Sequence, residues 1–159
     1  MFEAGVKCVI KEPITSRYMM MLETICGRYL IPVTIGTYDA EAIYQELNKI
    51  PTPRPMTHQF ISQIISVLDN VVIENAVIDG VKHGVFSAKL NLRNGDVSKS
   101  IDCRPSDAVA VALHLKIPVY VKEELIGKSC CIELNGLSGA EEKTLLGIMD
   151  DQGTTFWNA

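Results

Sequence analysis

The sequence predicts an α+β fold in which two strand-strand-strand-helix units form one curved, mainly antiparallel sheet around buried helices. The first observation is that two groups of three strand-like segments are each followed by a helical segment. The second is a similarity between Asp39-Ala40-Glu41-Ala42-Ile43 and Asp107-Ala108-Val109-Ala110-Val111, whose offset of 68 (107 minus 39) superimposes the two groups without a gap. The third is that short turns join successive strands, which favours antiparallel pairing.

In the first unit we expect strands over residues 6–11, 18–23 and 29–35 and a helix over 38–47. Asp39 and Glu41 lie in the first turn of that helix, where the helix dipole favours acidic side chains. The next loop, residues 50–55, contains three prolines, which exclude a helix or a central strand there. Thr57 is expected to cap a second helix with an apolar face formed by Phe60, Ile61, Ile64, Ile65 and Leu68.

In the second unit we expect strands over 71–79, 85–92 and 97–103, with turns at Asp79-Gly80 and Asn94-Gly95. The helix after Pro105 is apolar on every side from Ala108 to Leu113, which predicts a buried helix. A strand over 117–122 follows, and the predicted domain spans residues 1–126. Residues 127–159 are expected to form a C-terminal extension, with a capping box at Ser138 and Glu141, a short helix to Met149 and a loose tail.

Composition limits the possible functions. The chain has 159 residues, 47% of them apolar, which is enough for one domain with a core. Its net charge of −4 argues against a protein that simply coats nucleic acid. No apolar run approaches the roughly 20 residues of a membrane helix, and the N-terminus lacks the regions of a signal peptide. The five cysteines include no Cys-x-x-Cys pair, and no zinc-ligand spacing occurs, so we expect a cytoplasmic protein with reduced thiols and no membrane contact.

Three stretches together resemble a known family. They are Pro53-Arg54-Pro55-Met56-Thr57-His58, Ile101-Asp102-Cys103-Arg104-Pro105-Ser106-Asp107-Ala108-Val109-Ala110 and Ile117-Pro118-Val119-Tyr120-Val121-Lys122-Glu123-Glu124. Their order and motifs resemble the bifunctional nuclease family over about residues 6–126. The resemblance implies DNase and RNase activity, with DNA or RNA as substrate, and an internally duplicated α+β fold. Carried over by motif, it implies that the site includes Glu41, Arg54, His58, Asp102, Arg104, Ser106 and Asp107.

The sequence also departs from the family pattern at two places in these motifs. Gln59 stands where many members have an acid after the histidine, so a metal ligand is missing here if that acid binds a metal. Cys103 stands in place of a small residue, which indicates a packing difference.

These residue types suit metal-assisted phosphodiester hydrolysis. Carboxylates commonly hold Mg²⁺ or Mn²⁺ in such sites. Asp102 ends a strand and Asp107 begins a helix, so both could face one spot and hold the ion, and Glu41 could join them across the core. Arg104 and Arg54 suit the binding of phosphate, beside Ser106. His58 could act as a general acid or base.

Each candidate also has a structural interpretation. Asp107 could pair with Arg104, Asp102 could bind backbone amides near the turn, and Ser106 could serve as a helix cap. Arg54 could hold the proline loop in place, and His58 could bond a neighbouring loop. A bare Asp107 at the helix N-terminus repels phosphate, so the nuclease interpretation requires a metal unless Arg104 neutralises the aspartate.

Three function classes follow from these alternatives. The first is a metal-assisted nuclease that acts on DNA and RNA with little sequence preference. The second is a binding module that recognises an anionic ligand or a protein and does no chemistry. The third is an assembly protein whose edge strands pair between subunits of a homo-oligomer.

Overall fold

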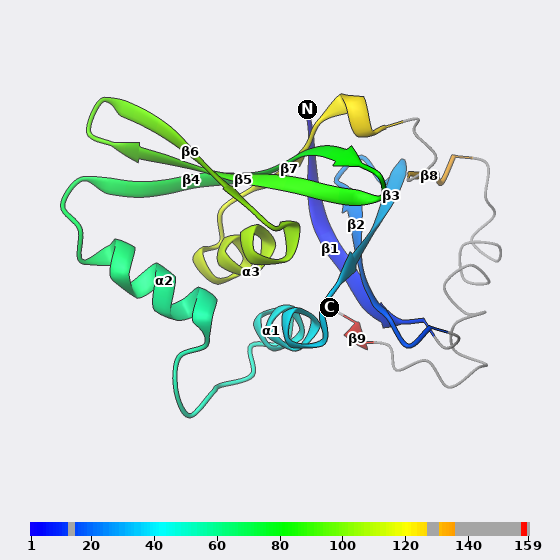
Figure 1. Ribbon diagram of the computed structural model, residues 1–159, viewed down its shortest axis with the longest axis horizontal. Coiled ribbons are helices and arrows are strands. Elements are labelled where there is room, and N and C mark those ends of the chain that lie inside the picture. The colour runs from blue at the N-terminus through cyan, green and yellow to red at the C-terminus, as the bar shows by residue number, and fades with distance from the viewer. Residues whose placement is uncertain (13–14, 127–130, 136–156, 159) are drawn as a thin grey trace.

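The computed structural model describes residues 1–12, 15–126, 131–135 and 157–158 (Figure 1). It has an α+β fold, as the sequence predicts, with a mostly antiparallel sheet and three α-helices in the described part. In chain order the elements are β1 (Phe2–Lys11), β2 (Tyr18–Thr24), β3 (Tyr29–Ile35), α1 (Thr37–Leu47), α2 (Thr57–Ser66), β4 (Val71–Lys82), β5 (Val85–Asn94), β6 (Val97–Cys103), α3 (Pro105–Leu115), β7 (Val119–Val121), the 3₁₀ helix η1 (Glu123–Leu125), β8 (Ile132–Glu133) and β9 (Trp157–Asn158).

The sheet joins two antiparallel meanders through one short strand. Its order is β6-β5-β4-β7-β1-β2-β3-β8, and β9 pairs with β1 outside this path. β7 lies parallel to β4 and antiparallel to β1, so it links the two halves. The remaining strand pairs are antiparallel, which agrees with the short turns of the sequence.

The last strand and the helix of each half have the same length and the same spacing in the sequence. β6 starts 68 residues after β3 (97 minus 29), and α3 starts 68 residues after α1 (105 minus 37). Each half therefore has three strands followed by an 11-residue helix. The internal duplication as the origin of this arrangement stays a prediction.

Two local predictions in these elements were wrong. β4 does not turn at Asp79-Gly80 but continues to Lys82, and the turn falls at His83 and Gly84. Both turn residues have positive φ, 51° and 78°, which matches the twist of a two-residue hairpin. The register shifts between Ile78 and Gly80, where a Cβ on Gly80 would lie 2.9 Å from Ser87 Oγ. The Asp-Gly signal therefore marks a β-bulge.

The second wrong prediction concerns the start of α2. Its N-cap is Met56, and Thr57 is the first helical residue. The Met56 N–H donates to Gln59 Oε1 at 3.0 Å, so the side-chain bond at this helix start comes from Gln59 and not from Thr57.

The main core lies between the sheet and the helices α1 and α3. α1 and α3 lie side by side next to the sheet, and α2 lies farther out (Figure 1). Seven of the 11 residues of α3 are buried, because its apolar surface contacts α1, α2, β4 and β5. Val9, Met20 and Ile31 from the first meander pack in the same core as Ile43 of α1 and Ile78 of β4. This packing fixes the N-terminus of α3 beside α1.

α2 packs on the protein through polar residues, although its sequence suggests that its apolar face would be buried. Its buried residues are His58 and Ser62, whereas its large apolar side chains Phe60, Ile61 and Ile64 are exposed, as are Val67 and Leu68 directly after the helix. Ile65 contacts the main core. The exposed apolar face is available for a partner, and the predicted homo-oligomer stays a prediction.

The C-terminal extension is described only in part. The predicted helix from Ser138 to Met149 lies outside the described residues, as does most of the tail. Within the tail, β9 pairs with β1 through Val9 and Trp157. Among the described helices none is long and apolar enough to span a membrane.

Candidate functional site

A cavity of about 560 Å³ opens where the loop before α2, the helix α2 and the N-terminal parts of α1 and α3 meet. Its polar lining includes four candidates from the sequence and one further aspartate: Asp39, His58, Arg104, Ser106 and Asp107. A second cavity of about 550 Å³ lies on the other side of Arg104 and Ser106 and also includes Arg17 and His83. Arg104 and Ser106 therefore stand between two hollows of the surface.

Arg104 is held by two aspartates. Its Nε and Nη2 donate to the two carboxylate oxygens of Asp107 at 2.8 and 2.9 Å. Nη2 and Nη1 also donate to Asp39 at 3.2 and 3.4 Å. Asp39 and Asp107 are the equivalent residues of the two similar segments, so Arg104 joins the first turns of α1 and α3. The hydrogen bonds and charge of Asp107, together with the charge of Asp39, raise the pKa of the guanidinium above its usual value.

Asp107 thus makes the pair with Arg104 that its structural interpretation expects. Two carboxylates around one guanidinium leave a net negative charge at this group of side chains. The Arg104 side chain is nevertheless 66% exposed and can be reached from solvent. Asp39 also accepts the N–H of Gly36 at 3.1 Å, which caps α1. Arg104 can thus touch an anion with its outer face, but most of its N–H groups are already engaged.

Ser106 lies in the first turn of α3 and is 5% exposed. Its hydroxyl has no hydrogen-bond partner among the residues that the structure describes, and it borders both cavities. The N-cap of α3 is Arg104, and Pro105 takes the first helical position, where a missing N–H costs nothing. Ser106 is therefore not the helix cap, and its hydroxyl is free to contact a ligand.

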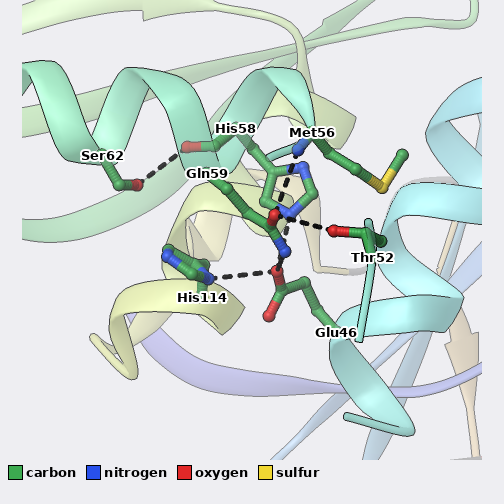
Figure 2. A network of polar contacts seen from close by, with 7 residues as sticks. All are labelled: Glu46, Thr52, Met56, His58, Gln59, Ser62 and His114. Carbon is green, nitrogen blue, oxygen red and sulfur yellow. Dashed lines mark hydrogen bonds and ion pairs between the residues drawn. The ribbon is translucent and has the colours of Figure 1, made fainter. Parts of the chain in front are cut away.

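His58 belongs to a polar cluster that joins three helices (Figure 2). Its Nε2 lies 2.7 Å from Oε1 of Glu46, which comes from α1. His114 from α3 places its Nδ1 3.1 Å from the same oxygen. Gln59 donates its Nε2–H to that oxygen as well, at 2.8 Å. The two imidazole rings meet edge to face, with their centroids 5.9 Å apart.

Glu46 is ionised in this cluster. Burial alone would raise its pKa, but the hydrogen bonds from Gln59 and His58 and the charges of the two histidines outweigh burial. The pKa of Glu46 consequently lies below its ordinary value of 4.5. A carboxylate therefore orients His58, and the other ring nitrogen, Nδ1, has no hydrogen-bond partner in the described part of the chain.

Three predicted site residues lie away from the cavity. Asp102 is exposed on β6 opposite Lys89, without an ion pair to any described residue. Glu41 is exposed on α1 and accepts a hydrogen bond from Gln45 at 3.3 Å. Arg54 is exposed in the proline loop and makes no ion pair within the described ranges, so it does not hold the loop through one.

The sequence reasoning missed Glu46, His114 and Arg17. Glu46 lies at the C-terminal end of α1, where an acid is unfavourable for the helix dipole, and this was the available signal. His114 lies near the C-terminal end of α3, and no motif in the sequence indicates its contact with Glu46. Arg17 borders the second cavity in a turn-rich segment that gives no functional signal.

The family model of the bifunctional nuclease domain matches residues 20–133, which is more than half of the chain. The chain belongs to the bifunctional nuclease domain family. Two proteins of Mycobacterium tuberculosis, from strains CDC 1551 / Oshkosh and ATCC 25618 / H37Rv, are each 32% identical to it over 120 residues. These residues make up 76% of this chain and 70% of each relative, and both relatives are described as uncharacterized proteins.

Within this bifunctional nuclease domain, Gln59 has a defined place. It caps α2 through Oε1 and supports Glu46 through Nε2. An acid at this position would stand beside the Glu46 carboxylate without the N–H that now joins them.

Proposed function

We propose that this protein is a nuclease that hydrolyses phosphodiester bonds of DNA and RNA, with little sequence specificity, at the cavity between α1, α2 and α3. Family membership supports the reaction class. The observation that carries the choice of site is His58, a buried imidazole that is oriented by Glu46 and borders a cavity with Arg104 and Ser106. DNA or RNA is accordingly the proposed partner.

His58 is the proposed general acid or base. When its Nε2–H donates to Glu46, Nδ1 carries a lone pair that can take a proton from water. The carboxylate fixes the ring and stabilises the imidazolium that forms, as in other carboxylate–histidine pairs. The same nitrogen can return the proton to the leaving oxygen, so one residue can serve both halves of the reaction.

Phosphate binding falls to the outer face of Arg104, the Ser106 hydroxyl and Arg17. Ser106 lies in the first turn of α3, where the backbone N–H groups and the helix dipole favour an anion. Arg17 borders the adjoining cavity and has no ion pair with a described residue. These groups offset the negative charge that Asp39 and Asp107 leave around Arg104. Arg54 adds a further exposed cation on the loop before α2.

The positions and contacts of Asp102 and Asp107 do not support the predicted binding of a divalent cation by this pair. Both oxygens of Asp107 accept hydrogen bonds from Arg104, and Asp102 does not border the cavity. A Mg²⁺ or Mn²⁺ ion held by this pair would have to displace the guanidinium. The metal role of Asp102 and Asp107, and a catalytic role of Glu41, stay predictions, and no step is assigned to them.

The test is cleavage of supercoiled plasmid and of labelled RNA by highly purified protein with Mg²⁺, with Mn²⁺ and with EDTA. We expect His58→Gln to lower the rate by about 10² to 10⁴, the usual contribution of a general acid or base. Asp96→Asn is the control, because Asp96 is exposed in the turn between β5 and β6 and borders neither of the two cavities. Equal cleavage by the folded His58→Gln variant would reject this site.

Asp107→Asn tests the metal prediction separately. If Asp107 holds the ion, the folded variant should need more Mg²⁺ for half-maximal cleavage than the parent. If Asp107 only positions Arg104, the Mg²⁺ requirement should stay the same while substrate binding weakens. Absence of cleavage in every condition would reject the nuclease proposal as a whole.

A binding or assembly module is the second candidate, and a specific observation favours it. α2 exposes Phe60, Ile61 and Ile64 to 55%, 38% and 45%, whereas its His58 is buried. An apolar face of this kind commonly marks a contact with another protein. This candidate predicts no cleavage, together with a solution mass above that of one chain.

A further inference from the structure

Glu46, His58 and His114 bring three metal-ligand atoms together. Glu46 Oε1, His58 Nε2 and His114 Nδ1 all lie within 4.8 Å of one another, and they form the one such group of three in the described part of the chain. The residues come from α1, α2 and α3, and no local sequence spacing links them. The cluster lies outside the Asp102 and Asp107 pair to which the sequence assigns a metal.

The spacing is close to that of a tetrahedral site. Zinc bonds of about 2.0–2.2 Å to nitrogen and oxygen place neighbouring ligand atoms about 3.3 Å apart. The two distances from Glu46 Oε1, 2.7 and 3.1 Å, need to grow slightly. The separation of the two ring nitrogens, which lies within 4.8 Å, has to settle at the same value. The rings can supply the adjustment by small rotations, since the His114 side chain is 32% exposed.

The donor types select the class of ion. Two imidazole nitrogens and one carboxylate oxygen suit Zn²⁺ and similar transition metals, whereas Mg²⁺ prefers oxygen ligands. Three protein ligands also leave a fourth position open for water, which the partial exposure of His114 allows. A bound cation would replace the ring protons that now satisfy the Glu46 carboxylate, so the buried charge stays compensated.

The surroundings hold the ligands in place. Gln59 donates to the same Glu46 oxygen, and its own side-chain oxygen is fixed by the Met56 N–H at 3.0 Å. Ser62 donates to the His58 carbonyl at 2.8 Å, one turn along α2. The Gln59 bond to the Glu46 carboxylate is of the kind that orients ligands in known metal sites, whereas the Ser62 bond steadies the helix backbone at His58.

We propose that Glu46, His58 and His114 form a binding site for Zn²⁺ that joins the three helices. The site shares His58 with the nuclease proposal, in which the zinc-free ring is the base. The two proposals are still tested separately, because zinc binding is measured without nucleic acid. With the ion on Nε2 of His58, the ring proton moves to Nδ1, on the ring that borders the cavity. The ion would also stabilise the folded state, since its ligands meet only when α1, α2 and α3 are packed.

The test uses the full chain after removal of metals with a chelator. Zn²⁺ is titrated by calorimetry, and Co²⁺ by its visible absorption as a probe of the same ligands. We expect one ion per chain and a rise in Tm with Zn²⁺. His114→Gln should weaken binding by more than about 100-fold, beyond the effect of losing a supporting hydrogen bond. His83→Gln, the exposed histidine, should bind as the parent does.

A measurement on the unaltered chain keeps the proposal testable if a variant misfolds. X-ray absorption of the zinc-loaded protein should detect two imidazoles and an oxygen. Sulfur ligands, or a thiolate-to-cobalt band in the near ultraviolet, would assign the ion to cysteine and overturn the proposal. Failure to bind Zn²⁺, or equal binding by His114→Gln, would overturn it as well and leave the nuclease proposal standing.

Discussion

The Glu46→Ala substitution tests whether the polar cluster holds the three helices together. It removes the shared acceptor of Gln59, His58 and His114. A hydrogen bond to a charged group is worth about 1.5–3 kcal/mol. His114 can turn to water, whereas His58 is 5% exposed and loses its partner. Counting mainly His58 and Gln59, and allowing for some rearrangement, we expect a loss of about 3 kcal/mol in the free energy of unfolding.

Glu41→Ala is the matched control on the same helix. Glu41 is exposed and accepts one hydrogen bond from Gln45 at 3.3 Å, so its removal should change the free energy of unfolding by less than about 0.5 kcal/mol. Glu46→Gln, which keeps an acceptor and loses the charge, should fall between the two. Urea denaturation at neutral pH with EDTA measures all three variants without a contribution from bound metal.

The same cluster predicts a pH dependence. Because the pKa of Glu46 is lower in the folded than in the unfolded chain, its carboxylate stabilises the fold above the unfolded value of about 4.5. That contribution is lost as the pH falls through the folded pKa. The difference in stability between the parent and Glu46→Gln should therefore shrink below pH 4.5. Equal stability of Glu46→Ala and Glu41→Ala at neutral pH would refute the structural role of the cluster.

Three further predictions concern other parts of the fold. Cys26 should react with iodoacetamide before Cys8 and Cys103, as measured by mass spectrometry, because hydrogen bonding lowers the pKa of its thiol. Burial raises the pKa of Cys8 and Cys103 to about 11, which leaves about 100-fold less thiolate than the ordinary pKa of 9.0 does. Faster labelling of Cys8 would contradict the packing. Leu125→Ala removes a fully buried side chain from η1 and should cost about 2–5 kcal/mol in urea denaturation, and a smaller loss would mean that this end is not packed. If the exposed face of α2 joins two chains, light scattering should give a dimer that Phe60→Lys converts to a monomer, and a monomeric parent chain would exclude it.

Much of the fold could be predicted because its signals are local. Pro105 begins α3 as expected, since a proline at the first helical position loses no hydrogen bond. The Asn94-Gly95 signal predicted the hairpin between β5 and β6, where Gly95 has a φ of 57°. The same kind of signal failed at Asp79-Gly80. Gly80 lies within the strand, where the absence of a side chain lets Ser87 of the neighbouring strand come close.

The candidate site could be predicted only where its residues lie near one another in the chain. The Arg104 and Asp107 pair has the three-residue spacing that brings side chains together on a helix turn. Asp39 joins them only because α1 packs against α3, and the sequence records this contact solely as a similarity between two segments.

The sequence by itself determined the mixed α+β class, the mostly antiparallel pairing and the motifs that mark the family. The tertiary structure alone decided that Glu46, His58 and His114 meet, that Asp39 joins the Arg104 and Asp107 pair, and that Asp102 and Glu41 lie away from the cavity. The physical reason is that local backbone preferences and hydrophobic periodicity act over a few residues. The side chains of a site instead meet through the packing of helices that are distant in the chain, and no spacing in the sequence encodes that distance.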